Sequence, residues 1–331
     1  MATPVDTSTT EVRTDAAPAK EIEGRSLGRI AWTRLKRDRV AMAGGIVIIL
    51  LVLMAVFAPL IVKWFGHPVD EYHDGPEFLD QSTGGVPVSG PLNSGISSDF
   101  WFGLEPQKGR DIFSRIVFGA RISLLIAFLA TLLSVTIGAT LGVVAGYLGG
   151  WVDTIISRLM DLFLAFPLLV FALAIVGVLP DHAFGLSGNG LKIAILVFII
   201  GFFNWPYIAR IVRGQTLSLR EREFVDAARS LGARAPYIIV REMLPNLVAP
   251  ILIYATLLIP SNVLFEAALS FLGVGIQPPT PSWGGMLGEA ANWTNLPHFM
   301  FFPGAAIFVT VLAFNLFGDG LRDALDPKGK R

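Results

Sequence analysis

The sequence predicts an all-α integral membrane protein with six transmembrane helices. Of its 331 residues, 53% are hydrophobic and only 16% are charged, whereas soluble domains carry about 25% charged residues. The mean hydropathy is +0.61. About 20 apolar residues are needed to cross ~30 Å of hydrocarbon, and six stretches approach or exceed that length. The predicted spans are residues 40–62, 122–147, 152–179, 191–212, 247–274 and 301–317.

The chain before the second span divides into three parts. Residues 1–30 are polar and mixed in charge, which predicts a disordered tail without a secretory signal. Residues 31–63 hold a basic cluster and the first span, and residues 64–119 form a polar segment. That segment is irregular at first, but charged and apolar residues alternate at helical spacing in residues 109–120. We expect this last part to lie along the membrane surface.

Residues 120–320 form a core of five spans, followed by a short tail, residues 321–331. Glycine recurs every fourth residue in the second span, which leaves one helix face nearly bare and predicts close packing against a neighbouring helix. These glycines are Gly138, Gly142 and Gly146. Prolines predict bends in the third, fourth and fifth spans. These are Pro167, Pro206 and Pro260.

The distribution of basic residues predicts the orientation of the chain. Six spans place both termini on one side, and 20 of the 26 Lys and Arg residues fall on that side. Basic residues accumulate in cytoplasmic segments. Both termini and the loop at residues 213–246 are therefore predicted to be cytoplasmic, and residues 64–119 extracytoplasmic.

The cytoplasmic loop has the pattern of two short helices. Ser218 and Glu221 have the spacing of a capping box, which predicts a helix over residues 219–231. Gly232 suits a left-handed C-cap. A second short helix would begin near Pro236 and end at Pro245.

One face of the first loop helix is apolar and suits a docking partner. Residues at positions i, i+4 and i+7 share a helix face. Here these residues are Phe224, Ala228 and Leu231, with Ala227 beside them. The loop therefore predicts a small docking surface outside the bilayer.

Polar residues inside the spans allow two interpretations. Glu266 lies well inside the fifth span with Asn262 one turn before it, and Asn315 in the sixth span is a candidate partner. The pair could line a pathway or couple an ion, or form a hydrogen-bonded strut between helices. Arg158 and Asp161 are three residues apart at the inner end of the third span. They could relay protons, but an anchoring ion pair is the simpler interpretation.

The sequence argues against an enzyme. It contains no P-loop motif, so the chain does not bind and hydrolyse ATP by that route. It has no cysteine, its four histidines are scattered outside the spans, and no nucleophile stands beside a base. We therefore expect no catalytic residue, metal or cofactor in this chain, and nothing indicates nucleic-acid binding.

The cytoplasmic loop resembles the EAA loop of ABC-importer permeases. The family pattern is EAA, three residues, Gly, nine residues, a hydrophobic residue, any residue and Leu-Pro. The matching positions are Asp226, Ala227, Ala228, Gly232, Leu244 and Pro245. Asp226 replaces the usual Glu, and Glu242 stands at the hydrophobic position.

Three further motifs narrow the resemblance to the C-type permeases of dipeptide, oligopeptide and nickel importers. They are GRDIFSRIVFGARISL at residues 109–124, FEAALSFLGVGIQPPTPSWGGML at residues 265–287 and FNLFGDGLRDALDPKGK at residues 314–330. With the loop and the end of the fourth span, NWPYIARIVRGQTLSLREREFVDAARSLGA at residues 204–233, they stand in the family's order. The resemblance covers residues 30–331, although residues 71–98 form a longer segment than the family's usual counterpart.

The resemblance implies a type I ABC importer permease in the cell (inner) membrane. Such a subunit pairs with a homologous B-type permease to line one path for short peptides. Two ATPase subunits bind ATP and Mg²⁺, and an external binding protein delivers the substrate. The EAA helix would dock on an ATPase subunit. Nickel and glutathione are alternative substrates.

Two other classes remain as alternatives to an ABC permease. One is a secondary transporter driven by an ion gradient, with Glu266 or Asp161 as the coupling residue. The other is a membrane scaffold whose loop forms an interfacial helix.

Overall fold

The computed structural model describes residues 27–178, 182–183 and 185–325, and most of them are helical. The predicted tails, residues 1–30 and 321–331, lie largely outside these ranges. Residues 27–30 are an exception, because they already belong to the first helix, and residues 321–325 continue the last one. The helices are α1 (Leu27–Leu35), α2 (Arg39–Val56), α3 (Ala58–Phe65), α4 (Ile112–Leu148), α5 (Gly150–Ala165), α6 (Leu168–Val178), α7 (Gly188–Arg220), α8 (Glu223–Ser230), α9 (Ala235–Tyr237), α10 (Leu244–Phe271), α11 (Trp283–Ala290) and α12 (Pro297–Leu325).

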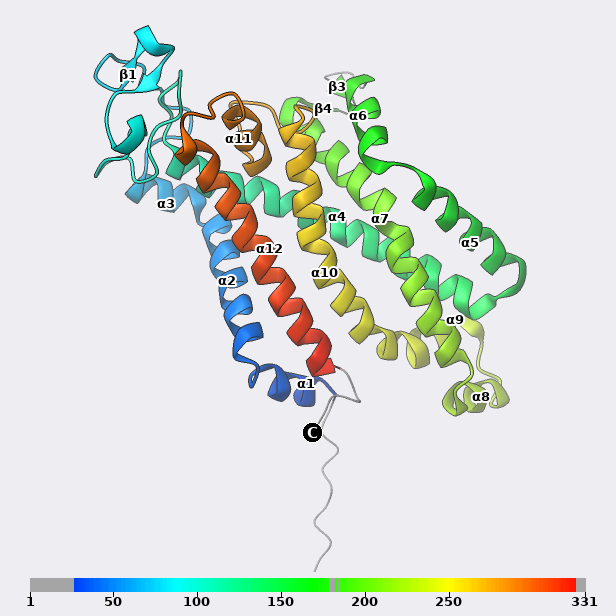
Figure 1. Ribbon diagram of the computed structural model, residues 1–331. Helices are drawn as coiled ribbons and strands as arrows, with labels where there is room; N and C mark the ends of the chain where they lie inside the picture. The colour runs from blue at the N-terminus through cyan, green and yellow to red at the C-terminus, as the bar shows by residue number, and fades with distance from the viewer. Residues whose placement is uncertain (1–26, 179–181, 184, 326–331) are drawn as a thin grey trace, which may run out of the picture.

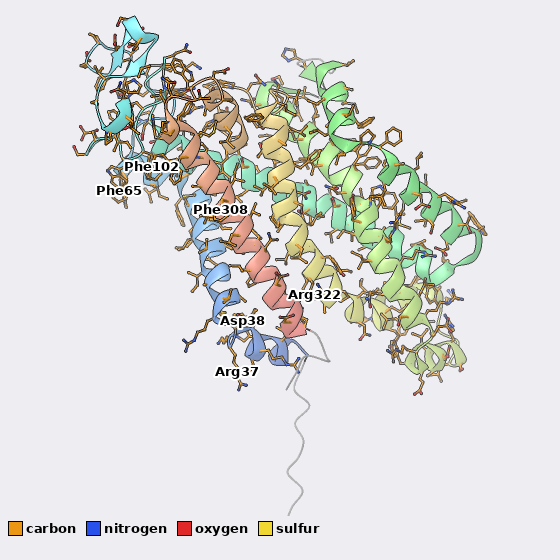
Figure 2. The ribbon with its side chains drawn as sticks, in the orientation of Figure 1. Arg37, Asp38, Phe65, Phe102, Phe308 and Arg322 are labelled. Atoms are coloured by element: carbon orange, nitrogen blue, oxygen red, sulfur yellow. The ribbon has the colours of Figure 1, made fainter. Side chains whose placement is uncertain are left out.

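The long helices lie side by side and define two ends of the molecule (Figure 1). The end that carries α1, α8 and the last turn of α12 is called the α8 end. The opposite end carries α3, α11 and the short strands and is called the α11 end. In Figure 2, Arg37, Asp38 and Arg322 lie at the α8 end, whereas Phe65 and Phe102 lie at the α11 end.

Among the described residues, five helices are long and apolar enough to cross a membrane, and a bent pair raises the number to six. The bent pair is α5 with α6, which meet at 77°. The break falls at Phe166 and Pro167, so the bend predicted at Pro167 is confirmed. The helices α7 and α10 continue through Pro206 and Pro260 as single elements.

The first span is shorter than predicted. The helix α2 ends at Val56, and α3 begins at Ala58 with Pro59 in its first turn. Proline is tolerated there because the first N–H groups of a helix have no partner within it. In Figure 1, α3 turns sharply away from the axis of α2. The predicted single span over residues 40–62 is therefore two helices.

The helices α4 and α7 share the most extensive contact among the described helices, and the glycine pattern predicts close packing on this face of α4. A Cβ atom on Gly138 would lie 2.6 Å from the carbonyl oxygen of Trp205, and one on Gly142 would lie 2.6 Å from that of Ala209. Gly146 faces Thr216 at a similar distance. The two backbones therefore touch along three helical turns.

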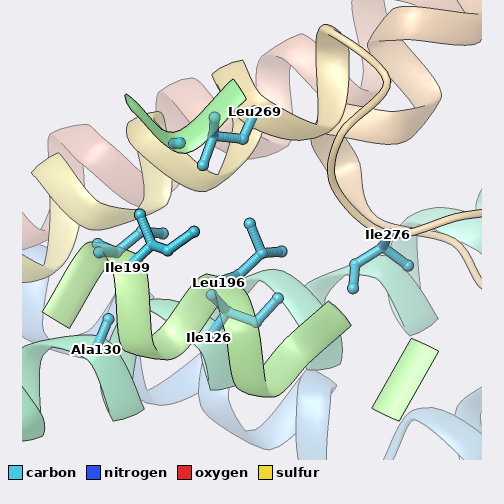
Figure 3. Packing of buried hydrophobic residues seen from close by; sticks show 8 residues of the cluster. Ile126, Ala130, Leu196, Ile199, Leu269 and Ile276 are labelled. Carbon is cyan, nitrogen blue, oxygen red and sulfur yellow. The ribbon is translucent and has the colours of Figure 1, made fainter. Parts of the chain in front are cut away.

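Aliphatic side chains from several helices fill the core beside this contact (Figure 3). Ile126 and Ala130 come from α4, and Leu196 and Ile199 come from α7. Leu269 and Ile276 close the cluster from α10 and the loop after it. This core fixes the helices that carry the polar residues discussed below.

The segment between α3 and α4 packs over the α11 end. It contains a two-residue antiparallel pair, β1 (Leu79–Asp80) with β2 (Val86–Pro87), and two 3₁₀ turns. A second small pair joins β3 (His182–Ala183) to β4 (Leu186–Ser187). Phe102 stacks on Phe302 of α12, with ring centroids 4.2 Å apart, so the segment is tied to the bundle.

Residues 109–120 do not form a separate surface helix. Asp111 is the N-cap of α4, and its side chain accepts hydrogen bonds from the backbone N–H groups of Phe113 and Ser114. From Ile112 onward the chain is part of the long second span, and Arg115 is buried. The prediction was wrong because the two arginines that gave the stretch its amphipathic pattern are neutralised inside the protein.

Candidate functional site

The EAA-like loop occupies the α8 end between α7 and α10. The helix α7 continues to Arg220, and α8 begins only at Glu223 after a two-residue break. Ser218 therefore lies in the last turn of α7, and Glu221 is the C-cap of that helix. The predicted capping box and the helix over residues 219–231 are wrong, because the fourth span supplies a preformed helix up to this point. The N-cap of α8 is Arg222, whose side chain makes no capping bond.

The end of α8 is fixed by backbone geometry. Gly232 has φ +81°, so the predicted left-handed C-cap is confirmed. Its N–H donates to the carbonyl of Arg229 at 2.9 Å, and the N–H of Ala233 donates to that of Ala228 at 3.0 Å. This pair of bonds is a Schellman motif, which sets the direction in which the chain leaves α8.

The helix α8 has an inward face and an open face. Val225 is fully buried, and half-buried Ala228 packs with it against the cluster that contains Met243 and Leu247. On the other side Phe224 and Ala227 are exposed, and Leu231 is 89% exposed. Phe224, Ala227 and Leu231 are called the open face below. Of the predicted docking residues, Ala228 is thus mostly committed to the protein's own core.

Arg229 connects α8 to the end of α4. Its guanidinium lies 5.6 Å from the centre of the Tyr147 ring, within the range of a cation–π contact. It also donates a hydrogen bond of 3.4 Å to Asp226. The helix is therefore held on its inner side by packing, and on its flank by Arg229.

The second half of the motif leads directly into α10. Pro236 lies in the first turn of α9, as predicted, and a π-helical turn (Ile238–Met243) joins α9 to α10. Leu244 and Pro245 form the first turn of α10 and are exposed. Pro245 therefore begins a helix and does not end one, because a proline at this position gives up no intrahelical bond.

A buried polar cluster lies between α4, α7 and α10. The side-chain amide of Asn262 donates to Thr131 Oγ1 at 2.8 Å, and its oxygen accepts from Asn204 at 3.0 Å. Each of these three residues comes from a different helix. Asn262 thus links three helices by hydrogen bonds. This agrees with the interpretation of the polar residues as a strut between helices.

Glu266 is fully buried one turn further along α10. Its Oε1 accepts a hydrogen bond of 2.7 Å from Ser270, while Oε2 has no hydrogen-bond partner. The predicted partner, Asn315, is exposed on α12 and makes none of these bonds. The prediction that Asn315 pairs with Glu266 was wrong, because the sequence gives the position of a residue along a span but not the direction in which its side chain faces.

The ion pair predicted at the inner end of the third span is weak. Arg158 and Asp161 are 4.0 Å apart and both exposed. Asp161 instead accepts a hydrogen bond of 2.9 Å from Arg210 of α7. Two turns earlier, Asp153 accepts hydrogen bonds from Nε and Nη2 of Arg213, the second at 2.7 Å. The acidic residues of α5 therefore fasten it to α7, an anchoring role.

Four charged residues meet at the α11 end, in a cluster that the sequence did not predict. Arg110 donates two hydrogen bonds of 2.6 Å to Glu105, and both groups are buried. Arg115 Nε lies 3.5 Å from Glu105, and its Nη2 donates to Glu289 of α11 at 3.2 Å. These four residues are called the charge quartet.

The members of the charge quartet titrate in opposite directions. Burial opposes ionisation of Glu105, but the charge of Arg115 and the bonds from Arg110 outweigh it and hold its pKa below the ordinary value. Burial, and then the negative charge of Glu105, raises the pKa of Glu289. Glu105 is therefore well compensated by positive charge, and Glu289 is not.

The described residues contain no group of three or more side chains suited to hold a metal ion. Two of the four histidines, His67 and His73, meet edge to face with ring centroids 5.3 Å apart. They pack with Phe78 and Phe100 in the segment before α4 and serve the packing of that segment.

Comparison with known proteins identifies the family. Residues 138–331 match the sequence profile of the binding-protein-dependent transport system inner membrane component, which covers more than half of the chain. The chain belongs to this family. Residues 26–76 match the N-terminal transmembrane domain of oligopeptide transport permease C.

Full-length relatives support the same assignment. The chain is 44% identical to the glutathione transport system permease protein GsiD of Shigella flexneri serotype 5b (strain 8401), over 90% of both chains. It is 43% identical to GsiD of Escherichia coli O6:K15:H31 (strain 536 / UPEC), with the same coverage. A solved structure of the MetNI methionine ABC transporter in an inward-facing conformation matches 65% of this chain and 98% of its own, with a TM-score of 0.54 at 19% identity. That likeness shows the fold.

The predicted family and fold are confirmed. The protein is a multi-pass membrane permease of an ABC importer, of the C type, with the type I importer fold. The relatives are transport permeases and not enzymes, in agreement with the prediction.

Proposed function

We propose that this permease forms half of the path for a short peptide in an ATP-driven importer, with glutathione as the first substrate to test. The two GsiD relatives carry glutathione in their names and share 43–44% of their residues with this chain over 90% of its length. Glutathione is a tripeptide, so the general prediction of short peptides includes it. Nickel is less favoured, because no relative named above has it in its name. Longer peptides stay in the test, because residues 26–76 match a domain of oligopeptide transport permease C.

The open face of α8 supports the proposed coupling to an ATPase subunit. Phe224 and Leu231 leave apolar surface exposed beside the small side chain of Ala227. Contiguous apolar surface with a polar rim is typical of a protein contact. Its back is packed on the core through Val225 and flanked by the Arg229–Tyr147 contact. A push on this face would be passed to α4, α7 and α10, since all three contribute to that packing.

The remaining partners follow from the same proposal. A homologous B-type permease completes the path, two ATPase subunits supply ATP and Mg²⁺ chemistry, and an external binding protein delivers the peptide. The α8 end would face the cytoplasm together with both termini. This orientation is supported by the position of α1, α8 and the end of α12 at one end of the bundle, and by the excess of basic residues there.

Reconstituted uptake tests the proposal. The full complex in proteoliposomes should accumulate labelled glutathione when ATP is supplied to the ATPase side, and should do so after ion gradients are collapsed. Uptake that stops with the ion gradient would support a secondary transporter instead. A panel with a dipeptide, a pentapeptide and a nickel chelate determines the substrate class. Preference for nickel would overturn the peptide proposal.

A further inference from the structure

A cavity of about 250 Å³ with both polar and apolar lining residues opens beside the charge quartet at the α11 end. It lies between the start of α4, the end of α10 and α11. Its polar lining consists of Arg115, Ser270, Gln277, Thr280, Glu289 and Asn292. Pockets that hold whole small ligands are roughly 300–1,000 Å³, so this cavity suits one end of a short peptide. None of these side chains has a role in the proposed coupling to the ATPase subunits.

Glu289 is the group of the quartet that an entering ligand meets. Its side chain is 24% exposed, whereas those of Glu105, Arg110 and Arg115 are at most 4% exposed. The path into the cavity therefore ends at a carboxylate, with the two guanidinium groups behind it.

The carboxylate of Glu289 is held less closely by the two arginines than that of Glu105. Both 2.6 Å bonds of Arg110 go to Glu105, while its contacts with Glu289 are 3.4 and 3.5 Å long. Arg115 reaches Glu289 at 3.2 Å but shares its charge with Glu105. Burial, and then the negative charge of Glu105, raises the pKa of Glu289. Its Oε1 accepts a long hydrogen bond of 3.5 Å from Arg110, and the carboxyl group also interacts with that of Glu105. A carboxylate oxygen accepts more than one hydrogen bond, so Oε1 retains capacity for another.

We propose that this cavity binds a primary ammonium group through Glu289, and that its physiological ligand is the free amino group of the transported peptide. An ammonium carries three N–H donors and no acceptor. It would place a positive charge beside Oε1, while the side chains of Gln277 and Asn292 line the same cavity and offer polar atoms to the rest of the peptide. This inference rests on the proposed function, because it assumes a peptide substrate.

The test measures amino-group preference and not overall transport. The full complex with its binding protein is reconstituted, and kcat/KM for glutathione is divided by that for its N-acetyl derivative. The binding protein's own selectivity is the same for all permease variants, so it cancels when variants are compared with wild type. E289Q removes the negative charge but keeps the size of the side chain. It should lower the preference about tenfold, or ~1.4 kcal/mol, since the variant loses a charge-assisted hydrogen bond to the ammonium group.

A matched control and a second variant keep the test decisive. Glu77 is an exposed carboxylate at the same end, and Glu77→Gln should leave the preference unchanged. Asn292→Asp adds a carboxylate at the exposed rim of the cavity and should increase the preference, which provides a test even if E289Q does not fold. An unchanged preference in both E289Q and Asn292→Asp would overturn the inference, as would equal losses for both cargoes in E289Q.

A lipid headgroup is the other source of a primary ammonium. The measurement is therefore repeated in vesicles with and without phosphatidylethanolamine. A peptide ligand predicts the same effect of E289Q in both. If E289Q changes uptake only in vesicles with phosphatidylethanolamine, and equally for glutathione and its N-acetyl derivative, the peptide assignment is overturned. If wild type transports neither cargo, the proposed function itself fails. If wild type transports both and the variants match it, only this inference fails.

Discussion

The two ends of the bundle treat charge in opposite ways. At the α11 end, Glu105, Arg110 and Arg115 are buried and bonded to one another. At the α8 end, the pairs of Asp161 with Arg210 and of Asp226 with Arg229 are all partly or fully exposed. Three of the four charges of the quartet are therefore satisfied within the chain, whereas the α8 end presents exposed charges and an apolar face. The difference indicates that the buried charges of the α11 end stabilise the fold, whereas the exposed surface of the α8 end is suited to binding other subunits.

Breaking the buried pair should have the largest effect. Arg110→Ala leaves the carboxylate of Glu105 buried without its two 2.6 Å bonds, which should cost about 3–5 kcal/mol of stability. Thermal and denaturant unfolding in mixed micelles measures the loss. Arg222→Ala removes an exposed arginine at the α8 end and should change stability by less than about 0.5 kcal/mol. Equal losses in the two variants would erase the contrast between the ends.

A charge on the open face should leave the fold intact but abolish docking. Ala227 is exposed, so Ala227→Glu should unfold at the same temperature as wild type. A buried, unpaired carboxylate in the contact should weaken binding of the ATPase subunits at least about a hundredfold, or ~2.7 kcal/mol. Co-purification and titration of the subunits measure this. Ala291→Glu places the same change at the α11 end and should leave binding unchanged.

The turn after α8 should be sensitive to side-chain shape. Gly232 has open space around its Cα but a φ of +81°, so Gly232→Val introduces backbone strain of about 1–2 kcal/mol without a clash. The strain should alter the angle of α8 and lower uptake per ATP hydrolysed. Gly214 also has open space and lies within helix α7. Gly214→Ala is the control and should keep coupling normal; normal coupling in Gly232→Val as well would contradict a rigid lever.

The charge quartet predicts a pH dependence with two signs. The folded pKa of Glu289 is raised, so stability should fall as pH rises from the ordinary carboxyl pKa to the raised one, by about 1.4 kcal/mol for each pH unit in that window. The folded pKa of Glu105 is lowered, so its contribution should be lost as pH falls below the ordinary value. Unfolding of wild type, E289Q and Glu105→Gln across pH separates the two. An E289Q profile that parallels wild type above the ordinary carboxyl pKa would contradict the assignment.

The exposed pair on α8 should have the smallest effect. Asp226 and Arg229 are 3.4 Å apart with exposed side chains, and exposed pairs contribute about 0.2–1 kcal/mol. Asp226→Ala should therefore lower the unfolding midpoint only slightly. High salt should reduce even that difference. A loss comparable with that of Arg110→Ala would show that the α8 end is also stabilised by its own charges.

Local patterns in the sequence predicted what local physics determines. The spacing of Gly138, Gly142 and Gly146 predicted close packing of the second span against a neighbouring helix, which the structure shows to be α7. Gly232 predicted a left-handed turn. Both depend on one stretch of backbone, so periodicity and residue type suffice. The predicted start of the loop helix was wrong, because tertiary structure extends α7 through Ser218 and overrides the local capping signal.

The charge quartet could not be predicted in this way. Arg110 and Glu289 are 179 residues apart, and nothing in a single sequence indicates that they meet. The same limit explains the failed prediction for Asn315. The sequence indicates its position along the span but not the direction of its side chain. A signal was present all the same, since two arginines close to an apolar span in residues 109–120 need a buried partner.

The glycine contact between α4 and α7 also limits how the molecule can move. Because backbone touches backbone along three turns, neither helix can slide past the other without a steric collision. Any alternation between two openings has to carry these helices as one rigid body. Any hinge would then lie outside this helix pair. The 77° break between α5 and α6 is one candidate, because the chain can rotate there without breaking hydrogen bonds within a helix.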